Sequence, residues 1–283
     1  MTKVISIQSQ VLHGHVGNSA AVFPMQAKGL EVVSVPTAIL TNHPHYPTMH
    51  GRVFEPELLA ALLLGVEERG LVEQASVIIT GFLASAANAQ VVADFMQRAR
   101  RSNPDLLYVC DPVMGDDDLG VFVKPELIPL FREALVPLAS IITPNQYELE
   151  LLAEADARTQ QDLEAAMASL HQRGMGAAVV TGCVMADTPA GWLESVAWSP
   201  RNTPDSTVRT ATPRLPIRPC GTGDLFTALL VARLCDGSPL AEAAKGATQE
   251  MTAVLQRTQD AGTEEMRIIG FPFAQPFQPE AGA

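Results

Sequence analysis

Residues 106–116 read LLYVCDPVMGD, a short apolar run that ends abruptly in a polar turn. A run of this kind is typical of a strand that is buried on both faces, as in a parallel sheet. Similar runs recur along the chain and alternate with longer amphipathic segments, which indicates βαβ units. The sequence therefore predicts one continuous α/β domain, with helices covering a mostly parallel sheet.

The pattern places most of the regular structure. The expected strands are Val4–Gln8, Val32–Val35, Ser76–Thr80, Leu106–Cys110, Ser140–Thr143 and Ala177–Thr181. The expected helices cover residues 18–28, 56–70, 86–101, 125–136, 145–154, 159–173, 222–235 and 240–257. Residues 182–206 lack this regularity and hold one hairpin-strand candidate, Trp192–Trp198; a loop this long is usually functional or mobile. We expect one domain over residues 1–270 and a surface tail over 271–283.

Composition and charge exclude several classes of protein. The 31 acidic and 19 basic residues give a formal charge of -12, which repels a phosphate backbone and argues against a nucleic-acid partner. The four cysteines form no Cys-x-x-Cys pair, so neither a disulfide framework nor a zinc knuckle is expected. Signal-peptide features and apolar runs of about 18 residues are also lacking. We expect a cytoplasmic protein with no membrane partner.

Polar residues follow the expected strands directly. They are Ser9, Asp111, Thr143, Asn145 and Thr181. In an open parallel sheet, ligands bind beyond the carboxyl ends of the strands. We therefore expect the functional site at that edge of the sheet.

The sharpest local signal is the tetrapeptide Gly221-Thr222-Gly223-Asp224, which precedes an apolar helix. Its glycines let backbone amides turn toward one point, and the helix start adds partial positive charge, so together they form an anion cradle. A carboxylate beside such a cradle would repel phosphate, yet it suits a base that deprotonates an attacking hydroxyl. The alternative is that Asp224 is only a favourable first-turn residue.

Three further carboxylates suit a magnesium site. Asp111 and Asp116 flank the turn after a buried strand, and Glu148 lies in the first turn of the next helix. Mg²⁺ takes few protein oxygens and bridges them to nucleotide phosphates. The neighbouring Asp117 and Asp118 are interpreted as solvated turn residues.

Histidines concentrate near the start of the chain. His13, His15, His43, His45 and His50 all lie in the first fifty residues. No helical i, i+4 pair with an attached carboxylate is present, and no cysteine is near them in sequence. Roles in loops and in ligand contact are therefore favoured over a zinc site.

Several of these segments together resemble one family. They are IQSQV at 7–11, GHVGNS at 14–19, NHPHY at 42–46, VCDPVMGD at 109–116, ITPNQYE at 142–148 and GTGDLF at 221–226. The chain resembles the vitamin B6 kinases (pyridoxal, pyridoxine and pyridoxamine kinases) of the ribokinase superfamily over about residues 4–257. The Gly-x-Gly-Asp element marks the superfamily; the Gln-Ser and Gly-x-x-Gly-Asn segments narrow it to the B6 kinases.

The resemblance implies a three-layer α/β/α ribokinase-like fold, a homodimer, and ATP- and Mg²⁺-dependent phosphorylation of the 5′-hydroxymethyl group of a B6 vitamer. Asp224 would be the base, and the amides of Gly221, Thr222 and Gly223 would hold the developing charge. The order of preference among the vitamers and a need for a monovalent cation such as K⁺ stay open.

The resemblance also implies a division of the site residues. The vitamer would contact Ser9, Val16, His45, Phe82 and Asp224. The nucleotide would contact Asp111, Thr143, Asn145, Glu148, Thr181, Arg214, Leu215 and Thr222, with residues 182–206 lying over it. Asp111, Asp116 and Glu148 would surround the metal. Two departures from the family pattern are Cys220, where some relatives have lysine, and residues 181–209, which match no member closely.

Two other functions fit parts of the pattern. A hydroxymethylpyrimidine kinase shares the superfamily fold, although those relatives commonly carry cysteine at the position of Asp224. A non-catalytic protein that binds B6 vitamers is the alternative from a different class. The intact cradle, base and metal-side acids argue against it.

Overall fold

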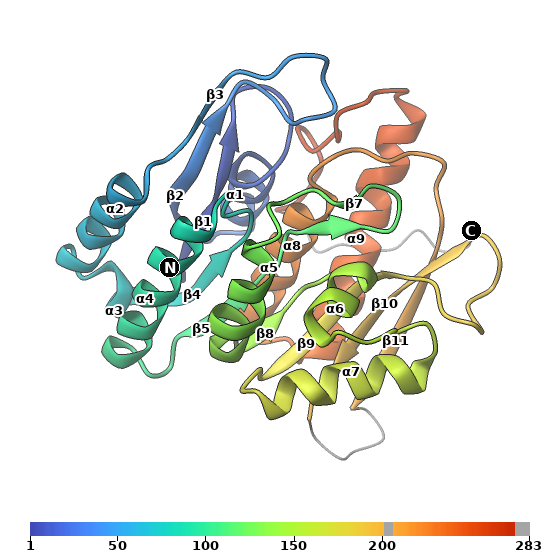
Figure 1. The fold of residues 1–283 in the computed structure, drawn as a ribbon. Helices are drawn as coiled ribbons and strands as arrows, with labels where there is room; N and C mark the ends of the chain where they lie inside the picture. Colours follow the sequence, from blue (N-terminus) through green and yellow to red (C-terminus); the bar gives the residue numbers. More distant parts are fainter. Residues whose placement is uncertain (201–205, 275–283) are drawn as a thin grey trace.

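A computed structural model of the chain describes residues 1–200 and 206–274. Its centre is one nine-stranded sheet in the order β11-β10-β9-β8-β5-β4-β1-β2-β3 (Figure 1). The strands are β1 (Lys3–Val11), β2 (Glu31–Leu40), β3 (Gly51–Val53), β4 (Ala75–Thr80), β5 (Leu107–Cys110), β8 (Ile141–Ile142), β9 (Ala177–Cys183), β10 (Trp192–Trp198) and β11 (Thr207–Pro213). Pairing is parallel from β2 to β9, while β3, β10 and β11 join antiparallel at the two edges.

Helices cover both faces of this sheet. One face carries α1 (Asn18–Ala27), α8 (Thr222–Cys235) and α9 (Leu240–Asp260). The other carries α2 (Pro56–Glu68), α3 (Leu71–Gln74), α4 (Ala86–Ser102), α5 (Leu127–Leu130), α6 (Gln146–Ala153) and α7 (Gln160–Gln172). Side chains of the central strands alternate between the two cores, since Ile78 faces one and Val77 and Ile79 the other. The expected three-layer α/β/α fold with a mostly parallel sheet is confirmed.

The expected helix over 125–136 is broken into three pieces. After α5 the chain forms a π-helical turn, Phe131–Leu135, and then a 3-10 turn, Val136–Leu138. Pro137 has no N–H to donate to the carbonyl four residues earlier, so a regular α-helix cannot continue through it. A small separate hairpin, β6 (Gly115–Asp116) with β7 (Gly120–Val121), precedes these turns.

The chain after residue 270 is partly in the core. Phe273 is 1% exposed and packs edge-on against Phe23. Phe273 alone departs from the expected surface tail among residues 271–274, because its ring packs against a side chain of α1, while Pro272 and Ala274 are exposed. Residues 275–283 lie outside the described part. Among the described residues, every helix is too short or too polar to cross a membrane.

The hairpin-strand candidate Trp192–Trp198 is confirmed as β10, and its partner β11 begins at Thr207, just beyond the segment expected to be irregular. β10 and β11 pair antiparallel from Trp192 opposite Pro213 to Trp198 opposite Thr207, and residues 201–205 lie outside the described part. Arg209 on β11 binds Glu194 on β10 through Nε–Oε2 (2.5 Å) and Nη2–Oε1 (2.8 Å). It also binds Asp187 in the turn before β10, with Nη1–Oδ2 at 2.8 Å. One arginine thus joins the hairpin to the segment that precedes it.

Replacing Arg209 with methionine should lower the free energy of unfolding by about 2 kcal/mol at pH 7, because the nearly buried Glu194 carboxylate loses its charged partner. The arginine lowers the pKa of Glu194, so its contribution is present above the ordinary carboxyl range and is lost as the pH falls. Urea unfolding at neutral and acidic pH should show the gap to wild type narrowing at acidic pH. Arg173→Met, at an exposed position, is the control, and an equal loss in both variants would contradict the assignment.

Candidate active site

Several of the predicted polar residues lie together beyond the carboxyl ends of the parallel strands, as expected. Asp111 follows β5 and is 3% exposed, and Thr143 follows β8 and is equally buried. The start of α8 reaches the same place, because a Cβ placed on Gly223 would lie 3.7 Å from Oδ2 of Asp111. The end of β5 and the glycine cradle therefore meet, although Asp111 and Gly223 are 112 residues apart in sequence.

The cradle has a tightly constrained backbone. Gly221 is the N-cap of α8, with a left-handed φ of 81°. A Cβ on this residue would stand 1.8 Å from the carbonyl oxygen of His15. The first-turn amides of α8 have no carbonyl partner within the helix, so they remain available to an anion. Only glycine lets the cradle lie this close to the turn at residues 14–17.

Asp224 lies beside that same turn. The backbone N–H of Gly17 donates to its carboxylate, and a Cβ on Gly17 would lie 2.7 Å from Oγ of Ser9. Ser9 sits where the pairing of β1 with β2 shifts register, a bulge that is common beside active sites. Burial raises the pKa of Asp224, and the Gly17 hydrogen bond opposes this shift. The result is a partly exposed carboxylate with increased proton affinity.

Asp111 fits a cation. Its Oδ2 is buried and has no hydrogen-bond partner among the described residues. Burial raises its pKa well above the usual range, and the charges of Glu148 and Asp224 add to this effect. An unpaired buried carboxylate oxygen facing a phosphate cradle is the donor that Mg²⁺ prefers. The local geometry therefore fits a metal that carries phosphate.

Glu148 is held by backbone amides. Its Oε1 accepts from the N–H groups of Met114 (2.9 Å) and Gly115 (3.4 Å), and its Oε2 accepts from that of Asn145 (2.9 Å). Asn145 caps α6 by accepting from the Glu148 N–H, so the two residues form a capping box. Burial raises the pKa of Glu148 to about 7. Glu148 and Asn145, which the sequence predicts as nucleotide contacts, therefore hold the turn after β5 against α6.

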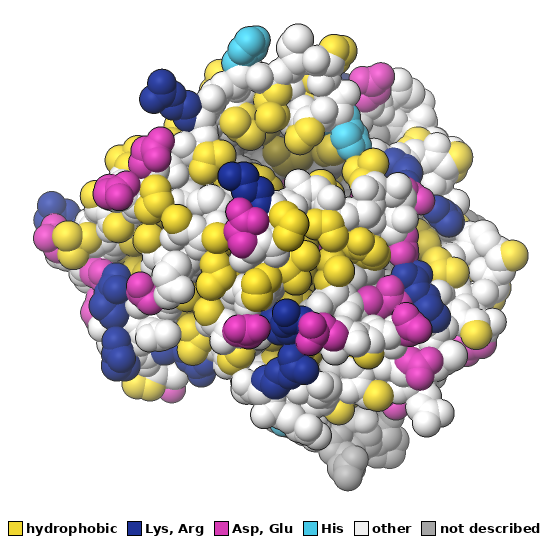
Figure 2. Space-filling view, viewed as in Figure 1, with side chains coloured by type: hydrophobic (Ala, Val, Ile, Leu, Met, Phe, Trp, Pro, Cys, Tyr) yellow, Lys and Arg dark blue, Asp and Glu magenta, His cyan; other side chains and the backbone are white. Residues whose placement is uncertain are grey.

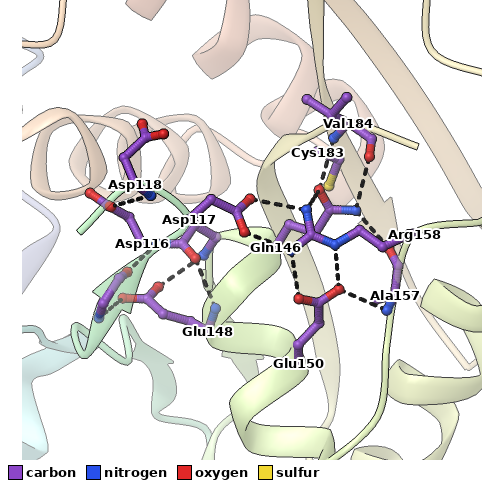
Figure 3. A network of polar contacts seen from close by, with 12 residues as sticks. Asp116, Asp117, Asp118, Gln146, Glu148, Glu150, Ala157, Arg158, Cys183 and Val184 are labelled. Atoms are coloured by element: carbon purple, nitrogen blue, oxygen red, sulfur yellow. Dashed lines mark hydrogen bonds and ion pairs between the residues drawn. The ribbon is translucent and has the colours of Figure 1, made fainter. Parts of the chain in front are cut away.

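The aspartate run after that turn is largely exposed, and its members have hydrogen-bond or ion-pair partners. Oδ1 of Asp116 accepts from the N–H groups of Asp118 (2.9 Å) and Leu119 (2.7 Å), as in an Asx turn. Asp117 binds Arg158, whose Nη2 also reaches Glu150 at 2.7 Å (Figure 3). Asp118 pairs with Arg218. The prediction that Asp117 and Asp118 are solvated turn residues is confirmed, since both side chains are exposed and their arginine partners also lie at the surface.

The remaining predicted nucleotide residues have local contacts. Thr143 Oγ1 lies 2.8 Å from Thr227 Oγ1, which ties the end of β8 to α8. The backbone N–H of Thr181 donates to the carbonyl of Pro144. Arg214 is exposed, and Leu215 lies beside it in the segment between β11 and the cradle.

The predicted vitamer residues come from three loops. Val16 lies against the cradle, with its Cα 3.1 Å from the Cβ position of Gly221. Phe82 follows β4, and its carbonyl accepts from Thr37. His45 is exposed and lies 3.3 Å (Nδ1) from Sγ of Cys220.

Sequence reasoning missed Glu265. Its Oε1 accepts from Tyr46 (2.8 Å) and lies 2.7 Å from Nε2 of His43, and its Oε2 accepts from the N–H of His15 (3.1 Å). It thereby ties the loop at 42–50 to the turn at 14–17. Nothing in the sequence signals this role, since Glu265 lies in an irregular stretch after the last helix.

A cavity of about 530 Å³ opens beside this carboxylate. It is lined by the loop at 42–50, by residues 217–220 and by residues 258–264. The space-filling view shows a hollow near the upper edge of the face, with a histidine at its rim (Figure 2). The cavity reaches Cys220, the residue before the cradle, and His45 is the predicted site residue that lines it.

Similarity to known proteins agrees with this geometry. Residues 17–268 match the phosphomethylpyrimidine kinase family model. The chain is 38% identical over 270 residues to pyridoxal kinase PdxY of Granulibacter bethesdensis, covering 94% of this chain and 93% of the relative. The chain belongs to the pyridoxal kinase family. The PdxY protein of Deinococcus radiodurans is also 38% identical, over 94% of this chain and 90% of its own length.

A solved pyridoxal kinase has the same fold. The structure from Leishmania donovani, in complex with ADP and pyridoxine, matches with a TM-score of 0.86 and 29% identity. The match covers 95% of this chain and 93% of that one. The expected kinase class and ribokinase-like fold are thereby confirmed for this pyridoxal kinase.

Gly221→Ala should lower kinase turnover by about 100-fold or more, because the cradle amides must move away from the developing charge. Gly237→Ala is the matched control. Gly237 has a similar φ of 86° beyond the other end of α8, and a Cβ there meets nothing within 4 Å. This control should lose only about 1 kcal/mol of stability and keep its turnover. Equal activity in the two folded variants, by ADP release and thermal unfolding, would refute the close-contact argument.

Proposed function

We propose that this pyridoxal kinase transfers the terminal phosphoryl group of ATP to the 5′-hydroxymethyl group of pyridoxal, with pyridoxine and pyridoxamine as further acceptors. The observation that carries the proposal is the position of Asp224. Its carboxylate is partly exposed between the phosphate-binding start of α8 and the Ser9–Gly17 contact. The relative from Leishmania donovani, in complex with ADP and pyridoxine, supports this pair of ligands.

In the proposed reaction, Asp224 accepts the proton of the acceptor hydroxyl. The hydroxyl oxygen forms a bond to the terminal phosphorus while the bond from that phosphorus to the bridging oxygen breaks, and ADP leaves. The amides of Gly221, Thr222 and Gly223 stabilise the charge on the transferred group because they are already oriented toward it. The increased proton affinity of Asp224 favours this transfer.

The vitamer is proposed to lie against Ser9, Val16, Phe82 and His45. Ser9 is held beside Gly17 and offers a hydroxyl to the ring nitrogen or its substituents. Phe82 offers a ring face for stacking. The nucleotide is proposed to extend from the cradle along Thr143, Asn145 and Thr181 toward Arg214 and Leu215.

Mg²⁺ is proposed to bind beside Asp111. The ion would supply positive charge between the phosphates and the carboxylates of Asp111, Glu148 and Asp224. The free Oδ2 of Asp111 is the best-placed oxygen for it, whereas Glu148 and Asp116 support the turn that carries the site. This arrangement explains how an acidic protein can hold a triphosphate.

Asp224→Asn should bind ATP and pyridoxal with near wild-type affinity while kcat falls by about 100-fold or more, because a neutral amide cannot accept the proton. Steady-state ADP release and equilibrium binding separate the two effects. Near-normal kcat would exclude Asp224 as the base.

Asp111→Asn should raise the Mg²⁺ concentration needed for half-maximal activity by about tenfold or more, because the free carboxylate oxygen is lost. A magnesium titration at saturating ATP and pyridoxal measures this shift. Asp117→Asn is the control, since its carboxylate binds Arg158, and it should leave the magnesium requirement unchanged. Identical requirements in all three proteins would remove Asp111 from the metal site.

The matched family model favours one second candidate, a hydroxymethylpyrimidine kinase. Asp224 argues against this candidate, because the hydroxymethylpyrimidine kinases that the sequence resembles commonly carry cysteine at that position. Competition between pyridoxal and hydroxymethylpyrimidine in one ADP-release assay decides between them. Tight binding of pyridoxal without ADP formation would instead indicate a non-catalytic binding protein.

The homodimer and the monovalent cation stay predictions. Light scattering of the purified protein tests the dimer, and turnover with K⁺ replaced by tetramethylammonium tests the cation.

A further inference from the structure

Three potential metal ligands meet at the cavity beside the cradle. Their side chains are His43, His45 and Cys220, and the ligand atoms all lie within 4.8 Å of one another. Cys220 lies 175 residues after His45 in the chain, yet its Sγ is 3.3 Å from Nδ1 of His45. The three residues also line the same 530 Å³ cavity.

Glu265 orients one of these ligands. Nε2 of His43 lies 2.7 Å from its carboxylate, whereas Nδ1 of the same ring accepts only a long hydrogen bond (3.4 Å) from the backbone N–H of His45, which a bound metal would replace. A histidine that binds a metal through one nitrogen usually donates from the other to a carboxylate or carbonyl. Glu265 is fixed in turn by Tyr46 and by the backbone of His15. The supporting contact that a metal-binding histidine requires is therefore already present.

The spacing is close to that of a tetrahedral site. With bonds of 2.0–2.3 Å, the ligand atoms of bound zinc lie about 3.5 Å apart. His45 is exposed and Cys220 is half-buried, so modest side-chain rotations can close the remaining distance. Two imidazoles and a thiolate suit Zn²⁺ and related ions, whereas Mg²⁺ prefers oxygen.

The surrounding charge also favours a cation. The carboxylate of Glu265 lies 2.7 Å from Nε2 of His43, and its negative charge attracts a divalent ion to the cluster. Coordination through Cys220 would displace the proton of its thiol.

We propose that His43, His45 and Cys220 form a binding site for a thiolate-preferring transition-metal ion such as Zn²⁺, separate from the magnesium of the nucleotide. A fourth position faces the cavity and is open to water or to a ligand. A bound ion links the loop at 42–50 to the residue before the cradle. Since His45 is also a proposed vitamer contact, occupancy of the site excludes the vitamer and inhibits the kinase.

Cobalt provides a direct test of the ligands. The protein is treated with EDTA, dialysed into magnesium-free buffer and titrated with Co²⁺. Wild type should develop the near-ultraviolet charge-transfer absorption of a cobalt–thiolate bond, and one equivalent of Zn²⁺ should abolish it. Cys220→Ser should lose this band. Cys235→Ser, at the other half-buried cysteine, should keep it.

Two further variants keep the test decisive if Cys220→Ser folds poorly. His45→Gln changes an exposed loop residue and should weaken Zn²⁺ binding, by competition with a fluorescent chelator, by about tenfold or more. Glu265→Gln should weaken it by a similar factor through the orientation of His43. Unchanged zinc affinity in both variants, or a cobalt band that survives in Cys220→Ser, would overturn the proposal.

Inhibition is measured separately from binding. Micromolar Zn²⁺ added to the Mg-ATP reaction should lower turnover of wild type and Cys235→Ser, with the loss relieved by excess pyridoxal. Unchanged turnover with the site occupied would refute the inhibitory role. The cobalt titration needs no turnover, so failure of the metal site and failure of the proposed kinase function give different results.

Discussion

The close contact between the start of α8 and the turn at residues 14–17 is the constraint on which the site depends. Gly221 can lie against His15 only because it has no side chain, and Gly17 can lie against Ser9 for the same reason. Together these contacts aim the helix amides and Asp224 at one point on the edge of the sheet. The phosphate side and the acceptor side of the site are thereby fixed relative to each other.

Accumulated negative charge is the second organising feature. Asp111 lies close to Glu148 and Asp224 in a chain of formal charge -12. Burial raises the pKa of each of these three carboxyl groups. Backbone amides satisfy Glu148, and the Gly17 amide contacts Asp224, whereas one oxygen of Asp111 has no described partner. The carboxylate oxygen that lacks a partner thus lies beside the glycine cradle, where a cation would compensate its charge.

Prediction from sequence succeeded where the signal was local and periodic. Five of the six parallel strands were recognisable because strands buried on both faces are almost wholly apolar. β2 was recognisable from its run of valines, although it is only partly buried. β3 was missed because its three residues are all exposed and carry no pattern. The helix over 125–136 was predicted as one piece because its apolar residues recur at helical spacing. That spacing carries no information about the backbone hydrogen bond that Pro137 cannot donate. Asp117 and Asp118 were correctly predicted to be solvated, but their ion pairs were not foreseen because Arg158 and Arg218 are remote in sequence.

The sequence by itself determined the alternating α/β pattern, the family resemblance and the glycine-aspartate cradle, because each of these is encoded in consecutive residues. Only the tertiary structure decided that Glu265 joins the two loops and that His43, His45 and Cys220 converge. No local rule connects side chains 175 or 222 residues apart. Their proximity follows from how α8 packs on α1 and α9 and from how Glu265, after α9, contacts the turn at 14–17 and the loop at 42–50.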